Sequence, residues 1–313
     1  MNQFLSFICF TLVSIPLFGQ QNNVLDTLTT NTKQLDEVVV SDSRFPLKRS
    51  QSGKPIIKID SKTISNFQGL GISALLKGYA GVEIIGSQTY SGQNKTVSLR
   101  GGRNRQVLIL IDGVRVSDPS RIDNDFNLNF LSLDQIESIE IMKGAASSLY
   151  GSAAATGVIN IITKKAAAGF NVNLQSSMGS DSDQSSKRGF NFFKNALQVS
   201  QGGESFKTKA YFSNHFTNGM SAVIGPEVDP FSHTNYGASL NFKGDSKFSV
   251  NAGFDSSHIT SDYDNNFPIE DADFQLITTM DRFNINPNFN YKNGGASLQF
   301  GYQKVKRDFK SDY

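Results

Sequence analysis

From residue 169 onward the sequence alternates between apolar and polar residues, and this pattern constrains the fold more than any other feature. In RFNINPNFNY (residues 282–291), Phe283, Ile285 and Phe289 fall on one face and four asparagines on the other. Because successive side chains of a β-strand point to opposite faces, such segments predict half-buried strands. The pattern recurs at about residues 169–178, 190–200, 205–216, 235–243, 246–258 and 295–305, which makes about seven strands in all.

The connections between these strands alternate in length. Long segments at residues 179–189, 217–234 and 259–279 alternate with the short segments QGGE, GD and NGG. All the long connections then lie at one end of the sheet, which is typical of outer-membrane barrels with short periplasmic turns. A soluble antiparallel sandwich is the alternative, but nothing in that class requires long connections at a single end. An odd number of strands leaves an open edge, so we expect these residues to be a fragment of a longer chain.

The first residues of the chain predict export. The segment MNQFLSFICFTLVSIPLFGQQ holds an apolar block from Phe4 to Phe18, followed by Gly19. Residues 1–20 resemble a secretory signal peptide, and their apolar block is shorter than the ~20 residues of a spanning helix. Its cleavage would remove Cys9, the one cysteine of the chain, and with it any thiol or disulfide chemistry. Residues 21–34 are polar and predict a flexible tail.

Charge and local motifs argue against nucleic-acid binding. The 30 basic and 28 acidic residues nearly balance, so no global field attracts a nucleic acid. The segment VSLRGGRNRQVLILIDGVRV (residues 97–116) has three interpretations: an RNA-binding patch, a phosphate loop or a structural turn. The basic glycine motif occurs once, as a short loop before two apolar runs, whereas RNA-binding segments of this kind are repeated. This favours the structural turn. The pair Asp112-Gly113 between those runs predicts a two-residue primed hairpin, and ISALLKGYAG (residues 72–81) predicts a short helix that stops at glycine.

The sequence contains no recognised catalytic pattern and one candidate metal site. Its three histidines lack metal-ligand spacing, and no nucleophile and base occur in a recognised local pattern. We therefore expect no catalytic activity and no covalent cofactor. The acidic run SDYDNNFPIEDAD (residues 261–273) predicts a calcium site in an extracellular loop, because calcium prefers hard oxygen ligands. Its ligands would be Asp262, Asp264, Asp271 and Asp273; an ordinary solvated loop is the alternative.

Residues 34–165 closely resemble the plug domain of TonB-dependent outer-membrane transporters. The matching segments follow the family order: LDEVVVS, ISALLKGYAGVEI, VSLRGGRNRQVLILIDGVRV and IESIEIMKGAASSLYGSAAATGVINIITKK. The resemblance implies a mixed α/β plug domain (residues 42–165), followed by the first strands (residues 169–313) of a 22-stranded antiparallel transmembrane barrel.

The same resemblance implies a location and a function. The protein would lie in the outer membrane of a Gram-negative bacterium, in contact with lipid, and would import a large scarce nutrient. A TonB-type protein would supply the energy. Cobalamin is the favoured substrate and a ferric siderophore the alternative; a passive porin or adhesin barrel would not carry a plug of this kind.

Residues 35–41 resemble the family's TonB box, the segment that binds the energy-transducing protein. A flexible tail with a β-branched run can add as a strand to a partner's sheet edge through main-chain hydrogen bonds. An ordinary first strand of the plug is the alternative. The residues of the box would be Asp36, Glu37, Val38, Val39, Val40 and Ser41.

Two further groups of residues follow from the resemblance. Arg100, Glu140 and Lys143 would lock the plug to the barrel, although lysine at position 143 replaces the usual arginine and loses its bidentate fork. Substrate contacts are expected on the long connections 217–234 and 259–279 and on the plug loop at residues 87–95. In that loop the expected contacts are Ser87, Gln88, Tyr90 and Asn94.

Overall fold

The computed structural model describes most of the chain from residue 47 onward. The described residues are 38–39, 47–86, 92–180, 189–219, 221, 223, 228–244, 247–266 and 269–311. The predicted signal peptide and polar tail lie outside them. In the part of the chain that the structure describes, no helix has the length and apolar character needed to cross a membrane.

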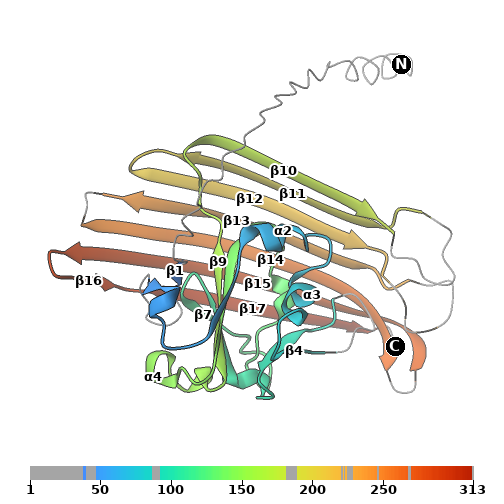
Figure 1. The fold of residues 1–313 in the computed structure, drawn as a ribbon. Coiled ribbons are helices and arrows are strands. Elements are labelled where there is room, and N and C mark those ends of the chain that lie inside the picture. The colour runs from blue at the N-terminus through green and yellow to red at the C-terminus, as the bar shows by residue number, and fades with distance from the viewer. Residues whose placement is uncertain are drawn as a thin grey trace, which may run out of the picture. The chain divides into compact units, whose positions relative to one another are not determined.

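The N-terminal half is built around a five-stranded mixed sheet with the order β3-β8-β9-β6-β7 (Figure 1). Its strands are β3 (Ile56–Ile59), β6 (Val107–Ile111), β7 (Val114–Val116), β8 (Ile136–Lys143) and β9 (Gly157–Thr163). Strands β6 and β9 are parallel, and the other neighbours are antiparallel. Two further antiparallel pairs are β4 (Val82–Ile85) with β5 (Thr96–Leu99), and β1 (Val38–Val39) with β2 (Leu47–Lys48). The predicted mixed α/β domain is confirmed.

Short helices fill the connections of this domain. They are α2 (Ser61–Ser65), α3 (Ile72–Lys77) and α4 (Ser147–Tyr150), with 3₁₀ turns η1 (Arg49–Gln51), η2 (Asn104–Gln106), η3 (Leu128–Phe130), η4 (Leu133–Gln135) and η5 (Ser152–Ala154). The Asp60 carboxylate caps α2 by accepting a hydrogen bond from the Thr63 amide at 2.8 Å. Helix α3 confirms the predicted helix but is shorter, because Gly78 ends it and the chain turns before β4.

Both faces of the five-stranded sheet are covered, which explains the apolar run VLILI in β6. All five residues of this strand are buried. Ile109 and Ile111 belong to a cluster that includes Leu76 of α3, whereas Leu108 and Leu110 belong to a second cluster. A strand that is buried on both faces has apolar residues at every position, so its sequence shows no alternation of apolar and polar residues. The basic glycine segment before β6 is a turn, in which the Gly102 amide donates to the Leu99 carbonyl at 3.0 Å.

The C-terminal half is a wall of antiparallel strands in sequential order (Figure 1). Its strands are β10 (Gly169–Gly179), β11 (Phe192–Gly202), β12 (Phe206–Thr217), β13 (Phe231–Lys243), β14 (Phe248–Asn266), β15 (Ile269–Tyr291), β16 (Gly294–Ser297) and β17 (Phe300–Ser311). Both β16 and β17 pair with β15, on successive stretches. They form the predicted seventh strand with a break, and Pro287, which has no N–H to donate, lies opposite that break.

The predicted long loop at residues 259–279 is wrong. Strands β14 and β15 continue through it as one hairpin, with Ile259 opposite Thr278 and Asn266 opposite Ile269. Polar and apolar residues mix on both faces of this part of the hairpin, so the period-two pattern that marks the other strands fades. Strand β13 also begins at Phe231, before the predicted residue 235, so the connection 217–234 is shorter than expected.

The two faces of the strand wall differ in polarity. Exposed apolar side chains lie on one face, in cross-strand pairs such as Leu197 with Phe212 and Phe254 with Phe283. The buried residues of the same strands are mostly polar, and Ser213, Asn235 and Ser257 are examples. An apolar outer face and a polar inner face are the alternation of an outer-membrane barrel, in which the outer face contacts lipid.

Candidate functional site

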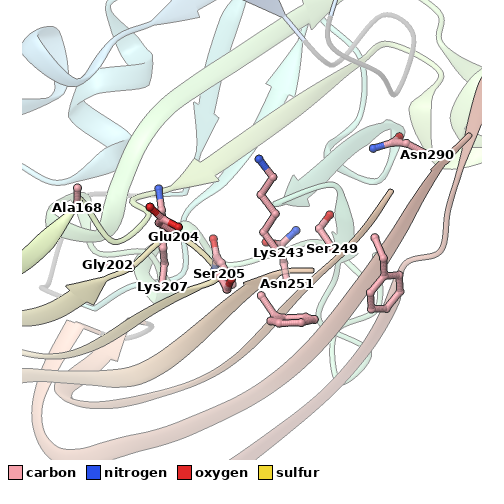
Figure 2. A pocket seen from close by; sticks show the side chains of 13 residues that line it. Ala168, Gly202, Glu204, Ser205, Lys207, Lys243, Ser249, Asn251 and Asn290 are labelled. Atoms are coloured by element: carbon pink, nitrogen blue, oxygen red, sulfur yellow. The ribbon is translucent and has the colours of Figure 1, made fainter. Parts of the chain in front are cut away.

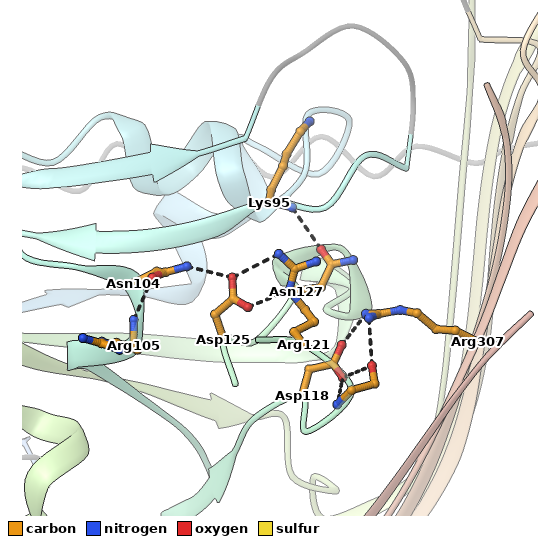
Figure 3. A network of polar contacts seen from close by, with 9 residues as sticks. Lys95, Asn104, Arg105, Asp118, Arg121, Asp125, Asn127 and Arg307 are labelled. Carbon is orange, nitrogen blue, oxygen red and sulfur yellow. Dashed lines mark hydrogen bonds and ion pairs between the residues drawn. The ribbon is translucent and has the colours of Figure 1, made fainter. Parts of the chain in front are cut away.

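The end of the predicted substrate loop is fixed to the segment 117–129 of the plug (Figure 3). The Lys95 amide donates to the Asn127 side chain at 3.2 Å, the Leu128 amide donates to the Lys95 carbonyl at 2.8 Å, and Asn129 Nδ2 donates to the Gln93 carbonyl at 2.7 Å. These bonds join two plug segments that are more than thirty residues apart in the sequence.

This surface lies at the end of the strand wall that carries the long connections. A β-carbon built on Gly92 would come within 2.6 Å of the Phe231 ring and 2.7 Å of Ser261 Oγ. Phe231 is the first residue of β13, directly after the connection 218–230, and Ser261 is its partner in β14. Of the predicted substrate residues, Ser87, Gln88 and Tyr90 lie outside the described residues.

Asn94, the fourth predicted contact, belongs to a charged network around Arg121. With its amide oriented to satisfy both polar atoms, Asn94 Oδ1 accepts hydrogen bonds from the Arg121 guanidinium at 2.7 and 2.9 Å. Arg121 Nε also pairs with Asp125 at 2.6 Å, and Asn104 Nδ2 donates to the same carboxylate at 2.9 Å (Figure 3). The side chain of Asn94 is half-buried and held by this network, which the sequence reasoning did not find.

The predicted lock residues are only partly brought together. Arg100 has a positive φ of 53°, and both it and Lys143 approach Gly81: a β-carbon on Gly81 would lie 3.8 Å from Arg100 Cγ and 4.0 Å from Lys143 Nζ. Lys143 Nζ donates to the Ala80 carbonyl. Glu140 is fully buried in β8 and accepts a hydrogen bond from Asn160 at 3.4 Å. The lock stays a prediction.

Two of the six predicted TonB-box residues are described, and they form β1. Val38 lies opposite Lys48 and Val39 opposite Leu47. Val39 is 0% exposed and packs in the same cluster as Leu108. A partner strand that pairs with β1 on the side of β2 therefore needs the release of β2. Asp36, Glu37, Val40 and Ser41 lie outside the described residues, and the box stays a prediction.

The four acids of the predicted calcium site lie on the two strands of the β14–β15 hairpin. Asp262 accepts a hydrogen bond from Gln275 Nε2 at 2.8 Å. Asp264 lies at a register shift between the strands and accepts hydrogen bonds from Ser221 Oγ at 2.5 Å and the Val223 amide at 3.2 Å.

Asp271 and Asp273 are exposed. Within the described ranges, no group of three or more histidine, cysteine or acidic residues is placed to hold a metal ion. The carboxylates of Asp262 and Asp264 are occupied by hydrogen bonds, so the geometry does not support the calcium site.

Two of the hollows along the strand wall are lined by both acidic and basic side chains. One of about 550 Å³ lies at the end with the short turns, where Glu204, Lys207 and Lys243 line it (Figure 2). The other, of about 250 Å³, lies between the plug sheet and the wall. In the second, Lys209 donates to the Lys164 carbonyl at 2.7 Å, and Arg282 pairs with Asp255 at 2.8 Å. The charge of Arg282 is thus neutralised within the fold, and the Lys209 ammonium is held by a hydrogen bond to a neutral carbonyl.

The Asp134 carboxylate joins the plug to the strand wall. It accepts hydrogen bonds from Ser132 Oγ and from Gln135 Nε2, and it lies 3.5 Å from Lys194 Nζ of β11. Lys194 also donates to the Gln68 carbonyl at 2.8 Å. Burial raises the pKa of Asp134, but the Lys194 ammonium and the hydrogen bonds together outweigh burial and hold this pKa below its ordinary value of 3.8.

We expect the contribution of Asp134 to stability to depend on pH. A carboxyl whose folded pKa is lowered stabilises the folded state above its unfolded pKa, and this stabilisation is lost as pH falls through the folded pKa. Asp134→Asn should lower the free energy of plug opening by about 1–3 kcal/mol at neutral pH. Hydrogen exchange of plug amides, corrected for intrinsic rates, measures this difference in opening free energy between wild type and variant. The difference should shrink as the pH falls below 3.8, the ordinary pKa of an aspartate. A difference that stays constant with pH would contradict this role.

Comparison with known proteins agrees with the fold and the plug geometry. Residues 48–158 match the family model of the TonB-dependent receptor plug domain. The vitamin B12 transporter BtuB from three Vibrio cholerae O1 strains is 38% identical over 138 residues, which is 44% of this chain and 22% of the length of each relative.

Solved structures extend the similarity to the strand wall. The siderophore receptor PirA from Acinetobacter baumannii aligns with a TM-score of 0.65 and 19% identity over 80% of this chain and 40% of that chain. The pyoverdine-bound FpvA of P. aeruginosa aligns with a TM-score of 0.66 and 16% identity over 85% and 36%. At this identity the likeness shows the fold alone.

The plug domain, the antiparallel strands that follow it and these similarities support an assignment to the TonB-dependent receptor family. The chain spans less than half the length of the relatives it matches, so its barrel is incomplete. Proteins of this family are outer-membrane receptors and transporters of Gram-negative bacteria, and the predicted location is confirmed.

Proposed function

We propose that the full-length protein imports a large scarce nutrient across the outer membrane, energised by a TonB-type protein that binds residues 36–41. The observation that carries the proposal is the plug domain, which matches its family model over residues 48–158 and is followed by antiparallel strands with an apolar outer face. A passive porin or adhesin has no need of such a domain. The proposal includes no catalytic step and no nucleic-acid partner.

We propose cobalamin as the substrate. Its support is the 38% identity over 138 residues to proteins named as vitamin B12 transporters. The solved siderophore receptors are 16–20% identical and support the fold, so a ferric siderophore remains the alternative. The test is equilibrium binding of cyanocobalamin and of ferric enterobactin to the purified full-length receptor. Binding of ferric enterobactin without cyanocobalamin would overturn the choice of substrate.

The same titration tests calcium. If Asp262, Asp264, Asp271 and Asp273 bind the ion, calcium should tighten the binding of cyanocobalamin, and removal of calcium by a chelator should weaken it. Equal affinity in both conditions would leave the substrate proposal intact and rule out the calcium site.

We expect Asn94→Ala to weaken binding of cyanocobalamin about tenfold, which corresponds to about 1.4 kcal/mol. The substitution removes a predicted substrate contact and also the acceptor that holds Arg121. Gln51→Ala, at an exposed polar residue outside this network, serves as the matched control and should bind as the wild type does. Titration of both variants decides the matter, and unchanged affinity of Asn94→Ala would remove this residue from the site.

A further inference from the structure

Strand β17 carries a row of residues that face the plug. A β-carbon built on Gly301 would clash with Val114 Cγ1, and Gln303 Nε2 donates to the Ser117 carbonyl. Val305 packs against the hydrophobic core that the plug shares with Met280 of β15. Arg307 continues the row two residues further on. This spacing of two is that of one face of a strand. The row runs alongside the plug chain as it leaves β7.

The row ends in an ion pair between Arg307 and Asp118. Arg307 NH2 pairs with Asp118, whose side chain is 0% exposed, and Arg307 NH1 donates to Ser120 Oγ at 2.8 Å (Figure 3). Asp118 also accepts hydrogen bonds from the Ser120 amide at 3.1 Å and from Ser120 Oγ at 2.6 Å. Arg307 therefore uses both arms of its guanidinium on one turn of the plug, which a lysine cannot reproduce.

The turn held by Arg307 leads directly to the network around Asn94. The Arg121 amide donates to the Asp118 carbonyl at 3.2 Å, and the Asn124 amide donates to the Arg121 carbonyl at 3.1 Å. The Arg121 guanidinium then binds Asn94 and Asp125. A continuous set of contacts thus runs from the strand wall to the end of the predicted substrate loop.

We propose that Arg307 is a positioning residue that fastens residues 117–125 of the plug to strand β17. It thereby holds in place the Asn94 surface, which consists of residues 93–95 and the side chains of Arg121 and Asp125 that bind there. Its importance for uptake rests on the proposed function, but the geometry does not depend on the identity of the substrate. The pairing joins residues 189 positions apart in the sequence, so the segment 117–125 is tied to the strand wall and not only to the plug.

Hydrogen exchange on the full-length receptor without substrate tests the proposal. Arg307→Gln should raise the exchange rates of amides in residues 117–125 on the order of tenfold, while those of β6 and β9 stay unchanged. Arg307→Lys should give a smaller increase. Lys306→Gln is the matched control, because Lys306 is exposed, points away from the plug and pairs with Asp308 of its own strand.

A double-mutant cycle with Asp118→Asn separates the ion pair from general damage. If the pair carries the effect, the double variant Asp118→Asn with Arg307→Gln should exchange no faster than the faster single variant. Additive increases would overturn the proposal, as would unchanged rates in residues 117–125 or an equal rise throughout the plug. Uptake of cyanocobalamin is measured separately. The hydrogen-exchange result therefore keeps its meaning even if the transport proposal fails.

Discussion

Proline at position 39 is expected to abolish energised uptake while leaving substrate binding at wild-type affinity. Proline removes the N–H that a partner strand would use and fixes φ, so the segment can no longer add to a sheet edge with full hydrogen bonding. The substitution lies far along the chain from the Asn94 surface. The measurement is accumulation of labelled cyanocobalamin in energised cells, set beside its binding to the same cells when they are de-energised.

The position of Val39 in β1 makes a control necessary. Val39 is buried and pairs with Leu47, so proline also disturbs the plug itself. Leu47→Pro disturbs the same strand pair from the opposite side and leaves residues 36–41 unchanged. Uptake should survive Leu47→Pro and fail in Val39→Pro. Equal loss in both variants would show that the pairing of β1 with β2, and not a partner strand, accounts for the effect.

Valine at position 113 should destabilise the plug by about 2 kcal/mol or more. The Asp112-Gly113 turn has φ values of 51° and 81°, as a type I′ turn requires. A β-branched residue is strained in this region by roughly 1–2 kcal/mol, and its β-carbon would also come 2.6 Å from Gln299 Nε2. The turn matters to the sheet because the Asp112 carboxylate accepts hydrogen bonds from the Thr163 amide and hydroxyl at 2.9 and 2.7 Å.

Native-state hydrogen exchange of β6, β7 and β9 measures this loss directly as a free energy of opening. Gly113→Asn is the matched control, because asparagine visits the left-handed region with little strain. The asparagine variant should lose clearly less stability than the valine variant. If the two variants were equally stable, strain at this turn would not be the cause.

The sequence predicts those parts of the fold that depend on short-range periodicity. The strands of the wall follow from alternation, and the Asp112-Gly113 hairpin follows from two residues that tolerate positive φ. The helix at α3 follows from its apolar spacing and the glycine after it, although it ends at Lys77, before the predicted end. In each case the information lies within about ten neighbouring residues.

Features that depend on distant partners were not predictable in this way. The hairpin of β14 and β15 continues where polar and apolar residues mix on both faces, because cross-strand pairing extends it there. Arg282 pairs with Asp255, 27 positions away in the sequence, and Arg307 pairs with Asp118, 189 positions away. No local sequence pattern predicts such pairs. The predicted calcium ligands were chosen by composition, and the structure engages two of them in hydrogen bonds instead.

The most direct test of energised import is accumulation of radiolabelled cyanocobalamin by cells that produce the full-length receptor, with and without a functional TonB protein. We predict that cells of both kinds bind the vitamin at the surface, because binding requires only the plug and the outer connections. Accumulation should occur only in cells with TonB. Equal accumulation in the two strains would contradict TonB-dependent transport by this protein.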